Sequence, residues 1–282
     1  MIKDLSYRID GGRTGILLLH GLSGTPSELR FVANGLARTG LTVHCPQLAG
    51  HGGTEEDLKN STWTDWYRSA EQALEEMSSV CDTVIVGGLS TGAILGLMLA
   101  AKNPGKVHAL ALYSPTLWLS GRSVPWYMPL FRIVNFRALA DLFRFPVPSH
   151  VGIKDRRIRE FVRGAQAASG KAPSTPGRVV LERHRLVKEV MKTLNEITSP
   201  ALVIHARDDD FAGLDNAEYL QTELGGPVDL TVLDDSFHMV TVDRERHVVV
   251  ERTIAFAERI TEAAKQAIEK ATLIKASARA AA

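Results

Sequence analysis

The sequence predicts an α/β fold built on a mostly parallel, doubly wound sheet. Two observations lead to this class: short apolar segments recur along the chain, and amphipathic helical patterns separate them. Apolar runs without alternation are typical of strands that helices cover on both faces. With 282 residues, 45% of them hydrophobic and 23% charged, the chain is long enough for one large α/β domain or two modest ones.

The predicted elements alternate in chain order. The expected strands are Gly15–Leu19, Gly40–Cys45, Thr83–Gly87, Val107–Tyr113, Ala201–His205 and Val228–Leu233. The expected helices are Pro26–Arg38, Thr64–Ser79, Thr91–Lys102, Arg178–Asn195, Asp215–Glu223 and Arg244–Lys270. Pro26 suits the first turn of a helix, and Gly40 suits the position just after its end. Strict alternation favours parallel neighbours joined by right-handed crossovers.

One long segment, from about Leu117 to Arg178, interrupts the alternation. It is rich in proline, aromatic residues and arginine, and it separates two predicted strands by more than a single crossover. We interpret residues 117–178 as a helical lid inserted over the carboxyl ends of the strands. Residues 1–116 and 179–270 then form the core. The alanine-rich tail, residues 271–282, either frays or extends the last helix.

The most informative motif follows the β-branched run Val84–Val86. It reads Gly88-Leu89-Ser90-Thr91-Gly92, or G-x-S-x-G, and an apolar helical pattern begins at once. The motif alone is common, but between a strand and a helix it forms a sharp turn that exposes a serine. A serine in such a turn adopts strained backbone angles, and Gly88 and Gly92 leave the room that side chains would fill. This pattern predicts Ser90 as a nucleophile.

A serine hydroxyl needs an imidazole to accept its proton, and the imidazole needs a carboxylate to fix its tautomer. In an open parallel sheet these groups come from loops after the carboxyl ends of strands. Among the histidines, only His238 follows a predicted strand in this way; His20 is expected in the core, and His51 is expected to organise its loop.

The acid comes from the run Asp208-Asp209-Asp210, in the segment that directly follows the predicted strand Ala201–His205. We favour Asp209 as the residue that orients His238, with Asp208 as the alternative. Repulsion between like charges allows only one of the three against the imidazole, so Asp210 is expected to cap a helix or to face water. The resulting order, serine, aspartate, histidine, matches one hydrolase fold and neither of two common protease folds.

Developing negative charge on a tetrahedral intermediate needs backbone N–H donors. The donor after the nucleophile is Thr91. The second donor comes from the loop after an earlier strand, Leu19–Gly24, in which we choose Leu22. These two N–H groups are the predicted oxyanion hole.

With these residues, the chain resembles the α/β-hydrolase superfamily, and within it bacterial carboxylesterases and monoacylglycerol lipases. The matching segments are Leu17–Pro26, Pro46–Gly52, Gly88–Gly92 and Ser236–Asp243. The resemblance implies hydrolysis of carboxylic esters with Ser90, Asp209 and His238 as the triad and with no cofactor. The arginine-rich insertion looks longer than a compact monoacylglycerol lipase lid.

The residue types in the insertion indicate which substrates the enzyme could accept. Its apolar side chains either line an acyl pocket or pack the lid onto the body; the candidates are Trp118, Trp126, Met128, Phe131 and Phe136. Its many basic residues suit a solvated surface. They also suit an anionic part of a substrate, an acidic acyl carrier, or transient contact with an anionic membrane surface.

Composition and short sequence patterns argue against several other classes of protein. A net charge of +1 gives no reason to expect nucleic acid, and no apolar stretch is long enough to cross a bilayer. Met1–Ser6 lacks the apolar core of a signal peptide, so we expect a cytoplasmic enzyme. Cys45 and Cys81 are expected as buried free thiols. No histidine pair has metal-ligand spacing and nothing resembles a calcium loop, so no metal is expected.

The sequence therefore predicts a serine esterase acting on acyl esters or monoacylglycerol-like substrates through an acyl-enzyme. One alternative is a thioesterase or acyltransferase that uses the same residues on acyl-CoA or carrier-bound acyl groups. Another is a ligand-binding receptor on the same scaffold. Carbon–carbon hydrolase and haloperoxidase-type activities are also compatible with such a fold. The sequence carries no signal for an oligomeric state.

Overall fold

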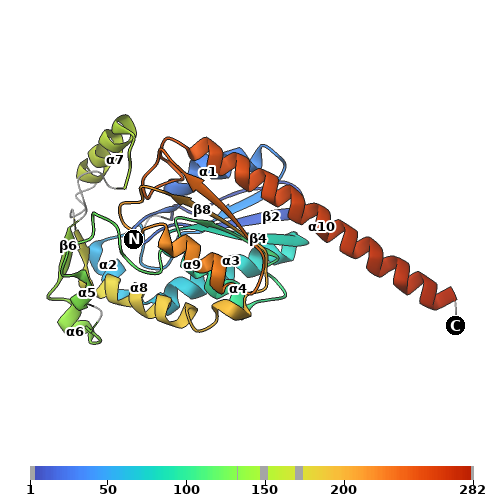
Figure 1. The fold of residues 1–282 in the computed structure, drawn as a ribbon, viewed down its shortest axis with the longest axis horizontal. Coiled ribbons are helices and arrows are strands. Elements are labelled where there is room, and N and C mark those ends of the chain that lie inside the picture. The colour runs from blue at the N-terminus through green and yellow to red at the C-terminus, as the bar shows by residue number, and fades with distance from the viewer. Residues whose placement is uncertain (1–3, 132, 147–151, 169–173, 281–282) are drawn as a thin grey trace.

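A seven-stranded sheet lies between two layers of helices in the computed structural model, which describes residues 4–131, 133–146, 152–168 and 174–280 (Figure 1). Helices α1 and α10 cover one face of the sheet, and α3, α4 and α8 cover the other. This is the two-sided covering that continuous apolar strands require. The predicted α/β class with a mostly parallel sheet is confirmed.

The elements have the following bounds. The strands are β1 (Tyr7–Ile9), β2 (Thr14–Leu19), β3 (Thr42–Cys45), β4 (Thr83–Leu89), β5 (Ala109–Tyr113), β6 (Arg144–Pro146), β7 (Ser174–Pro176), β8 (Ala201–Ala206) and β9 (Val228–Leu233). The helices are η1 (Pro26–Leu29), α1 (Arg30–Ala37), α2 (Glu55–Asn60), α3 (Trp63–Val80), α4 (Thr91–Lys102), α5 (Met128–Phe131), α6 (Arg137–Ala140), α7 (Arg156–Ala168), α8 (Gly177–Val190), η2 (Leu194–Glu196), α9 (Asp215–Glu223) and α10 (Arg246–Ala280).

The strand order is β1-β3-β2-β4-β5-β8-β9, with every neighbouring pair parallel except β1 with β3. All six predicted strands are present at nearly the predicted positions. The short edge strand β1 was not predicted, because three half-exposed residues carry no apolar run. Helix α2 was not predicted either, although Thr54 and Asp57 form the capping box that marks its start.

The core consists of two apolar clusters, one on each face of the sheet. Residues Ile16–Leu19 of β2 are fully buried and contribute alternately to the two clusters. Helix α4 lies in the middle of one layer, and its residues from Thr91 to Ala100 are all buried. Cys45 and Cys81 are buried and unlinked, as predicted.

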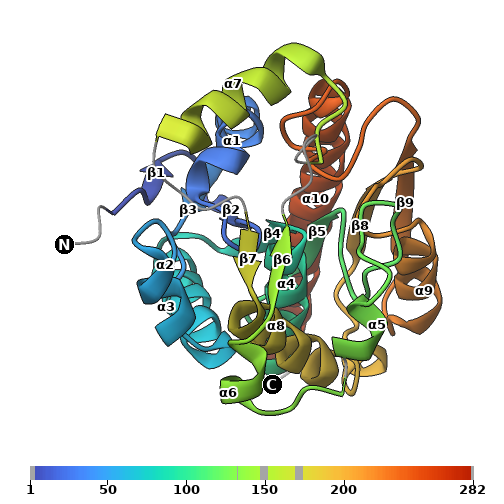
Figure 2. The same cartoon turned by 90° about the vertical axis from the view of Figure 1, so that its left-hand side faces the viewer.

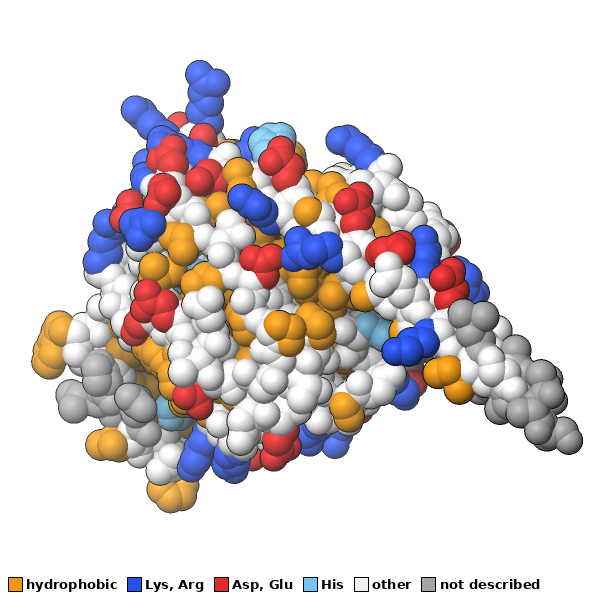
Figure 3. All heavy atoms as spheres, turned by 45° about the vertical axis from the view of Figure 1, so that its right-hand side comes forward, with side chains coloured by type: hydrophobic (Ala, Val, Ile, Leu, Met, Phe, Trp, Pro, Cys, Tyr) orange, Lys and Arg blue, Asp and Glu red, His pale blue; other side chains and the backbone are white. Residues whose placement is uncertain are grey.

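Helix α10 is the last element and projects beyond the body of the protein (Figure 1). Of the two fates expected for the alanine-rich tail, extension of the helix is the one observed, up to Ala280. Acidic and basic side chains are interspersed on the face shown in Figure 3. Within the described ranges, none of the helices combines the length and the apolarity needed to span a bilayer.

The described residues of the insertion (117–131, 133–146, 152–168 and 174–178) lie at the end of the body opposite the projecting part of α10, and this end faces the viewer in Figure 2. It is not purely helical, because β6 and β7 pair as a small antiparallel sheet beside α5, α6 and α7. Three-residue strands give too short a pattern for recognition from sequence. The insertion has its own small core with α8, formed by Phe131, Val134, Ala140, Phe145, Val180 and Leu181.

Hydrogen bonds join the insertion to the loops that follow β8 and β9. The N–H groups of Ser120 and Gly121 donate to the carbonyl of Phe211, at 3.1 and 3.0 Å. The N–H of Met239 donates to the carbonyl of Gly152 at 2.9 Å. These contacts hold parts of the insertion at the carboxyl ends of the parallel strands.

The turn between β4 and α4 brings three backbone segments into contact. A Cβ atom at Gly92 would lie 2.0 Å from the carbonyl oxygen of Leu19, and one at Gly88 would lie 2.4 Å from the carbonyl carbon of Gly92. Real Cβ atoms do not approach backbone so closely, so the predicted need for glycine at 88 and 92 is confirmed.

We therefore predict that Gly92→Ala lowers the free energy of unfolding by about 1–3 kcal/mol, because the backbone of β2 must move to admit a methyl group. The matched control is Gly96→Ala on the same helix, where the new Cβ would meet side chains in ordinary contact, Val86 at 3.4 Å and Leu110 and Leu112 at 3.8 Å. Chemical denaturation of both variants measures the difference. Equal stability of Gly92→Ala and Gly96→Ala would contradict the crowding described here.

Candidate active site

Ser90 occupies the turn after β4 in a backbone conformation that side chains rarely adopt, with φ 54° and ψ −111°. Its N–H donates to the carbonyl of Tyr113 at 2.9 Å, which ties the turn to the end of β5. The residues on either side are buried, whereas Ser90 itself is partly exposed. The turn therefore holds a hydroxyl group at the carboxyl edge of the sheet.

The hydroxyl of Ser90 has a specific partner in Thr116, with the two oxygens 3.2 Å apart. Thr116 Oγ1 donates to the carbonyl of Ser114 at 3.0 Å. Since that bond uses the only hydroxyl proton of Thr116, the Ser90 hydroxyl is the donor in the pair. The serine proton therefore points at a neutral oxygen in this arrangement.

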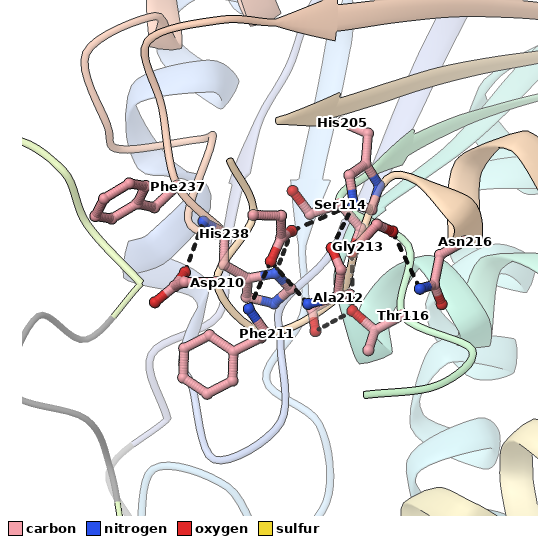
Figure 4. A network of polar contacts seen from close by, with 12 residues as sticks. Ser114, Thr116, His205, Asp210, Phe211, Ala212, Gly213, Asn216, Phe237 and His238 are labelled. Atoms are coloured by element: carbon pink, nitrogen blue, oxygen red, sulfur yellow. Dashed lines mark hydrogen bonds and ion pairs between the residues drawn. The ribbon is translucent and has the colours of Figure 1, made fainter. Parts of the chain in front are cut away.

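His238 and Asp209 meet in the loops after β9 and β8. His238 Nδ1 lies 2.8 Å from Asp209 Oδ2, and both side chains are buried. The other carboxylate oxygen, Oδ1, accepts from the N–H groups of Phe211 and Ala212, each at 2.8 Å. The carboxylate is thereby fixed, Nδ1 carries the proton, and Nε2 of His238 is left as the basic nitrogen. Figure 4 shows His238 and Thr116 in the same cluster of polar side chains.

The contact between His238 and Asp209 shifts the pKa of both residues. Burial acts to lower the pKa of His238, but the charge of Asp209, its hydrogen bond and the charge of Asp210 outweigh burial and raise that pKa. Burial acts to raise the pKa of Asp209, but the charge and hydrogen bond of His238, with help from the backbone N–H of Ala212, lower it. The arrangement therefore stabilises the imidazolium that forms when His238 accepts a proton beside the ionised carboxylate.

The three consecutive aspartates have different surroundings. The Asp208 side chain is 49% exposed and lies 3.3 Å from Lys154 Nζ, so it is solvated and paired with a lysine. Asp210 is fully buried, which corrects the expectation that it caps a helix or faces water. Its carboxylate accepts from the N–H of His238 at 3.3 Å and from the hydroxyl of Ser123 at 3.2 Å. Repulsion does not exclude a second buried carboxylate here, because these donors compensate its charge.

A second histidine contacts the same acid from the other side. His205 Nε2 donates to the carbonyl of Ala212 at 2.8 Å and lies 3.4 Å from Asp209 Oδ2. Burial lowers the pKa of His205, so its ring is neutral. His20 is a fully buried core residue, as predicted, with Nδ1 3.0 Å from the carbonyl of Gly21 and Nε2 accepting from Leu48 N–H.

The two predicted oxyanion donors lie on neighbouring strand ends. Leu19 at the end of β2 pairs with Gly88 in β4, which sets the loop containing Leu22 beside the turn containing Ser90. A Cβ at Gly21 would lie 3.9 Å from the Ser90 Cβ. Thr91 is the first residue of α4, where backbone N–H groups have no acceptor within the helix. The partial positive charge of a helix N-terminus adds to this site.

The five aromatic and apolar residues predicted for the substrate pocket separate into two groups. Trp118, Met128 and Phe131 are at least half-buried: Trp118 donates to Asp215 at 2.6 Å, and the other two pack within the core of the insertion. Trp126 is 85% exposed and Phe136 is 74% exposed, so neither lines an enclosed pocket. The expectation for these two is wrong, because residue type does not reveal which side of a short helix or loop faces solvent.

Sequence reasoning missed three residues near this cluster. Thr116 could have been found, since it follows β5 just as the other candidates follow their strands. Asp243 is fully buried and accepts from the N–H groups of Lys154 and Phe237, which connects the insertion to the loop of His238. Arg183, on α8, donates to the carbonyl of Thr116. Asp243 lies before α10 and Arg183 lies within α8, and no local pattern marks either residue.

No group of three or more histidine, cysteine, aspartate or glutamate side chains that could hold a metal ion occurs in the part of the chain that the structure describes.

We predict that Asp209→Asn lowers kcat/KM by about 10⁴-fold, because the amide can hold the wrong imidazole tautomer. Asp208→Asn is the matched control and should change kcat/KM less than about threefold, because this carboxylate is solvated. Steady-state hydrolysis of a 4-nitrophenyl ester measures both variants. A larger loss in Asp208→Asn than in Asp209→Asn would assign the acid to the other residue.

The chain resembles known hydrolases over most of its length. The family described as "Serine aminopeptidase, S33" matches residues 12–245. A thermostable monoacylglycerol lipase of Bacillus sp. (strain H-257) is 27% identical over 258 residues, which cover 89% of this chain and 92% of that protein. A carboxylesterase of Bacillus subtilis (strain 168) is 24% identical over 256 residues, which cover 90% of this chain and 96% of that protein.

Solved structures agree with these matches. A structure from work on the metagenome-derived lipolytic enzymes LipS and LipT has a TM-score of 0.77 and 26% identity, covering 90% of this chain and 97% of its own. A soluble variant of the Saccharomyces cerevisiae monoglyceride lipase has a TM-score of 0.75 at 14% identity, covering 90% and 91%, and shows the same fold. The chain therefore belongs to the serine aminopeptidase S33 family and is an α/β-hydrolase of the esterase and lipase type.

Proposed function

We propose that this enzyme hydrolyses carboxylic esters through an acyl-enzyme, with Ser90 as nucleophile, His238 as general base and Asp209 as the acid that orients it. The observation that carries the proposal is the buried hydrogen bond from His238 Nδ1 to Asp209 Oδ2, which leaves Nε2 free to accept a proton. The strained turn at Ser90 supports the assignment of the nucleophile. The names of the two Bacillus relatives support esters, including monoacylglycerols, as substrates.

In the proposed reaction, the Ser90 hydroxyl turns from Thr116 to Nε2 of His238. His238 takes the proton as Oγ attacks the ester carbonyl carbon, and the carbonyl π electrons move to the oxygen. The N–H groups of Leu22 and Thr91 stabilise this oxyanion. His238 then gives its proton to the departing alcohol oxygen, and the acyl–alkoxy bond breaks.

A water molecule completes the cycle. His238 removes a proton from the water as its oxygen attacks the acyl carbon, and a second tetrahedral oxyanion occupies the same donors. Collapse of this intermediate breaks the bond to Ser90 Oγ, which recovers its proton from His238, and the carboxylic acid leaves. Asp209 stays ionised throughout and stabilises the imidazolium in both halves.

We predict that Ser90→Ala lowers kcat on 4-nitrophenyl esters by at least about 10⁴-fold and abolishes labelling by a fluorophosphonate. The control is Ser79→Ala, which removes an exposed hydroxyl that donates to the Glu76 carbonyl at 2.7 Å near the end of α3. If Ser90→Ala is nearly as active as the wild type, Ser90 is not the nucleophile and the proposed mechanism is wrong.

The same assay separates ester from thioester hydrolysis. Rates are measured on 4-nitrophenyl esters of increasing acyl length and on acyl-CoA thioesters of the same acids. An esterase shows the higher kcat/KM on oxygen esters, whereas a thioesterase or acyltransferase shows it on the acyl-CoA series. A wild type that neither hydrolyses esters nor accepts the fluorophosphonate would point to a binding protein on this scaffold.

The insertion offers a contact surface for lipid substrates. Its apolar side chains that face solvent are Trp126, Ile133, Phe136, Leu139, Leu142 and Phe161. Several of its basic residues are already paired, as Arg137 is with Glu182 and Arg178 with Asp141. We propose that these apolar side chains bring the enzyme to an anionic lipid surface, with the remaining arginines adding a weaker attraction.

We predict that the wild type co-sediments with phosphatidylglycerol vesicles and that the double change Trp126→Ser and Phe136→Ser reduces the bound fraction at least about fivefold. Ile268→Ser with Ile274→Ser is the control, because these exposed residues lie on the projecting part of α10. Equal binding of the two double variants would place the contact elsewhere, and no binding of the wild type would reject it.

A further inference from the structure

Arg183 differs from the other arginines on α8. Arg178 pairs with Asp141, and Arg185 pairs with Glu182 at 2.8 Å. Arg183 is only 6% exposed, and among the residues that the structure describes no carboxylate forms an ion pair with it. Burial lowers the pKa of Arg183 to about 10, which leaves the guanidinium charged at neutral pH. The helix therefore carries a buried positive charge without an acidic partner in the described part of the chain.

This charge lies beside the reacting groups. Its Nη2 donates to the carbonyl of Thr116, the residue whose hydroxyl oxygen lies 3.2 Å from Ser90 Oγ. The same charge acts on His238, where it opposes Asp209 by lowering the pKa of the imidazole. Arg183 thus connects α8 to both the nucleophile and the base.

One hydrogen bond to a backbone carbonyl does not require a charged side chain. A neutral amide could donate one hydrogen bond to Thr116, whereas a buried guanidinium has five N–H donors and a large desolvation cost. Buried charges are normally paired, and the planar fork of arginine matches a carboxylate with two parallel hydrogen bonds. The described residues supply no such group, and the carboxylate of a bound ligand would match the unused donors of Arg183.

We infer that Arg183 binds a carboxylate of the substrate, and hence that this enzyme prefers esters whose acyl chain or alcohol carries a carboxylate group. The inference rests on the proposed function and narrows its substrate class. A bound carboxylate also offsets the charge that Arg183 exerts on His238, so the imidazolium formed in the reaction is stabilised when the anionic substrate is present. Arg183 acts as a specificity-determining residue.

Two pairs of matched substrates test the inference. In the first pair the charge is on the acyl chain: mono-4-nitrophenyl adipate against its methyl ester. In the second pair the charge is on the alcohol: 4-butyryloxybenzoate against its methyl ester. The measured quantity is the ratio of kcat/KM for the anionic substrate to that for the neutral one, after subtraction of uncatalysed hydrolysis.

In at least one pair, Arg183→Met should lower this ratio at least about tenfold, because a charged hydrogen bond is lost. Arg183→Lys should keep part of the preference, since a point charge remains without the fork. Arg185→Gln is the matched control: it removes the same charge two residues along α8 and should leave the ratio unchanged. The pair that responds tells whether the carboxylate lies on the acyl or the alcohol side.

The inference is wrong if the ratio is the same in the wild type and in Arg183→Met for both pairs. Arg183 would then serve only to hold the Thr116 carbonyl in place. If Arg183→Met does not fold by circular dichroism, inhibition of the wild type decides. Adipate should then compete with a neutral ester while dimethyl adipate competes at least about tenfold less well, and equal inhibition rejects the inference. Hydrolysis of neutral esters and fluorophosphonate labelling of Ser90 test the proposed function separately.

Discussion

The approach of β2, β4 and α4 around Ser90 is the constraint on which the site depends. Gly92 lets α4 begin against the carbonyl of Leu19, and Gly88 lets the chain reverse within that space. Ser90 takes a positive φ there, a conformation that costs of the order of 1–3 kcal/mol. The hydrogen bond from its N–H to Tyr113 and the fully buried helix behind it offset this strain. This strained turn places the Ser90 hydroxyl at the edge of the sheet where the loops after the other strands end.

The charges around His238 shift its pKa in opposite directions. Asp209 at the ring and Asp210 at the backbone favour the imidazolium, while burial and Arg183 oppose it. The two carboxylates can be neighbours because each has its own donors, from backbone N–H groups and from the hydroxyl of Ser123. The balance holds the pKa of this buried imidazole above its ordinary value, so the ring accepts a proton more readily than burial alone would allow. Arg183 makes this balance sensitive to an anion in the site.

The architecture of the sheet could be predicted in detail. Strands buried on both faces leave an uninterrupted apolar run such as Ile16–Leu19, and helices leave a period near 3.6, so both patterns are local. The bounds of α4 and α9 agree with the prediction residue for residue. The missed strands were short, β1 and the β6–β7 pair, and in them pairing with a distant partner outweighs weak local preference.

The sequence by itself determined where chemistry could occur. The glycines around Ser90 and the rule that loops follow strands are local facts, and they were sufficient to select His238 and a run of three aspartates. Only the tertiary structure decided that Asp209 faces the ring, that Asp210 is buried behind it, and that Arg183 reaches Thr116. These are contacts between segments far apart in the chain. Their existence depends on how side chains of different elements are oriented after packing, and periodicity and composition do not encode that orientation.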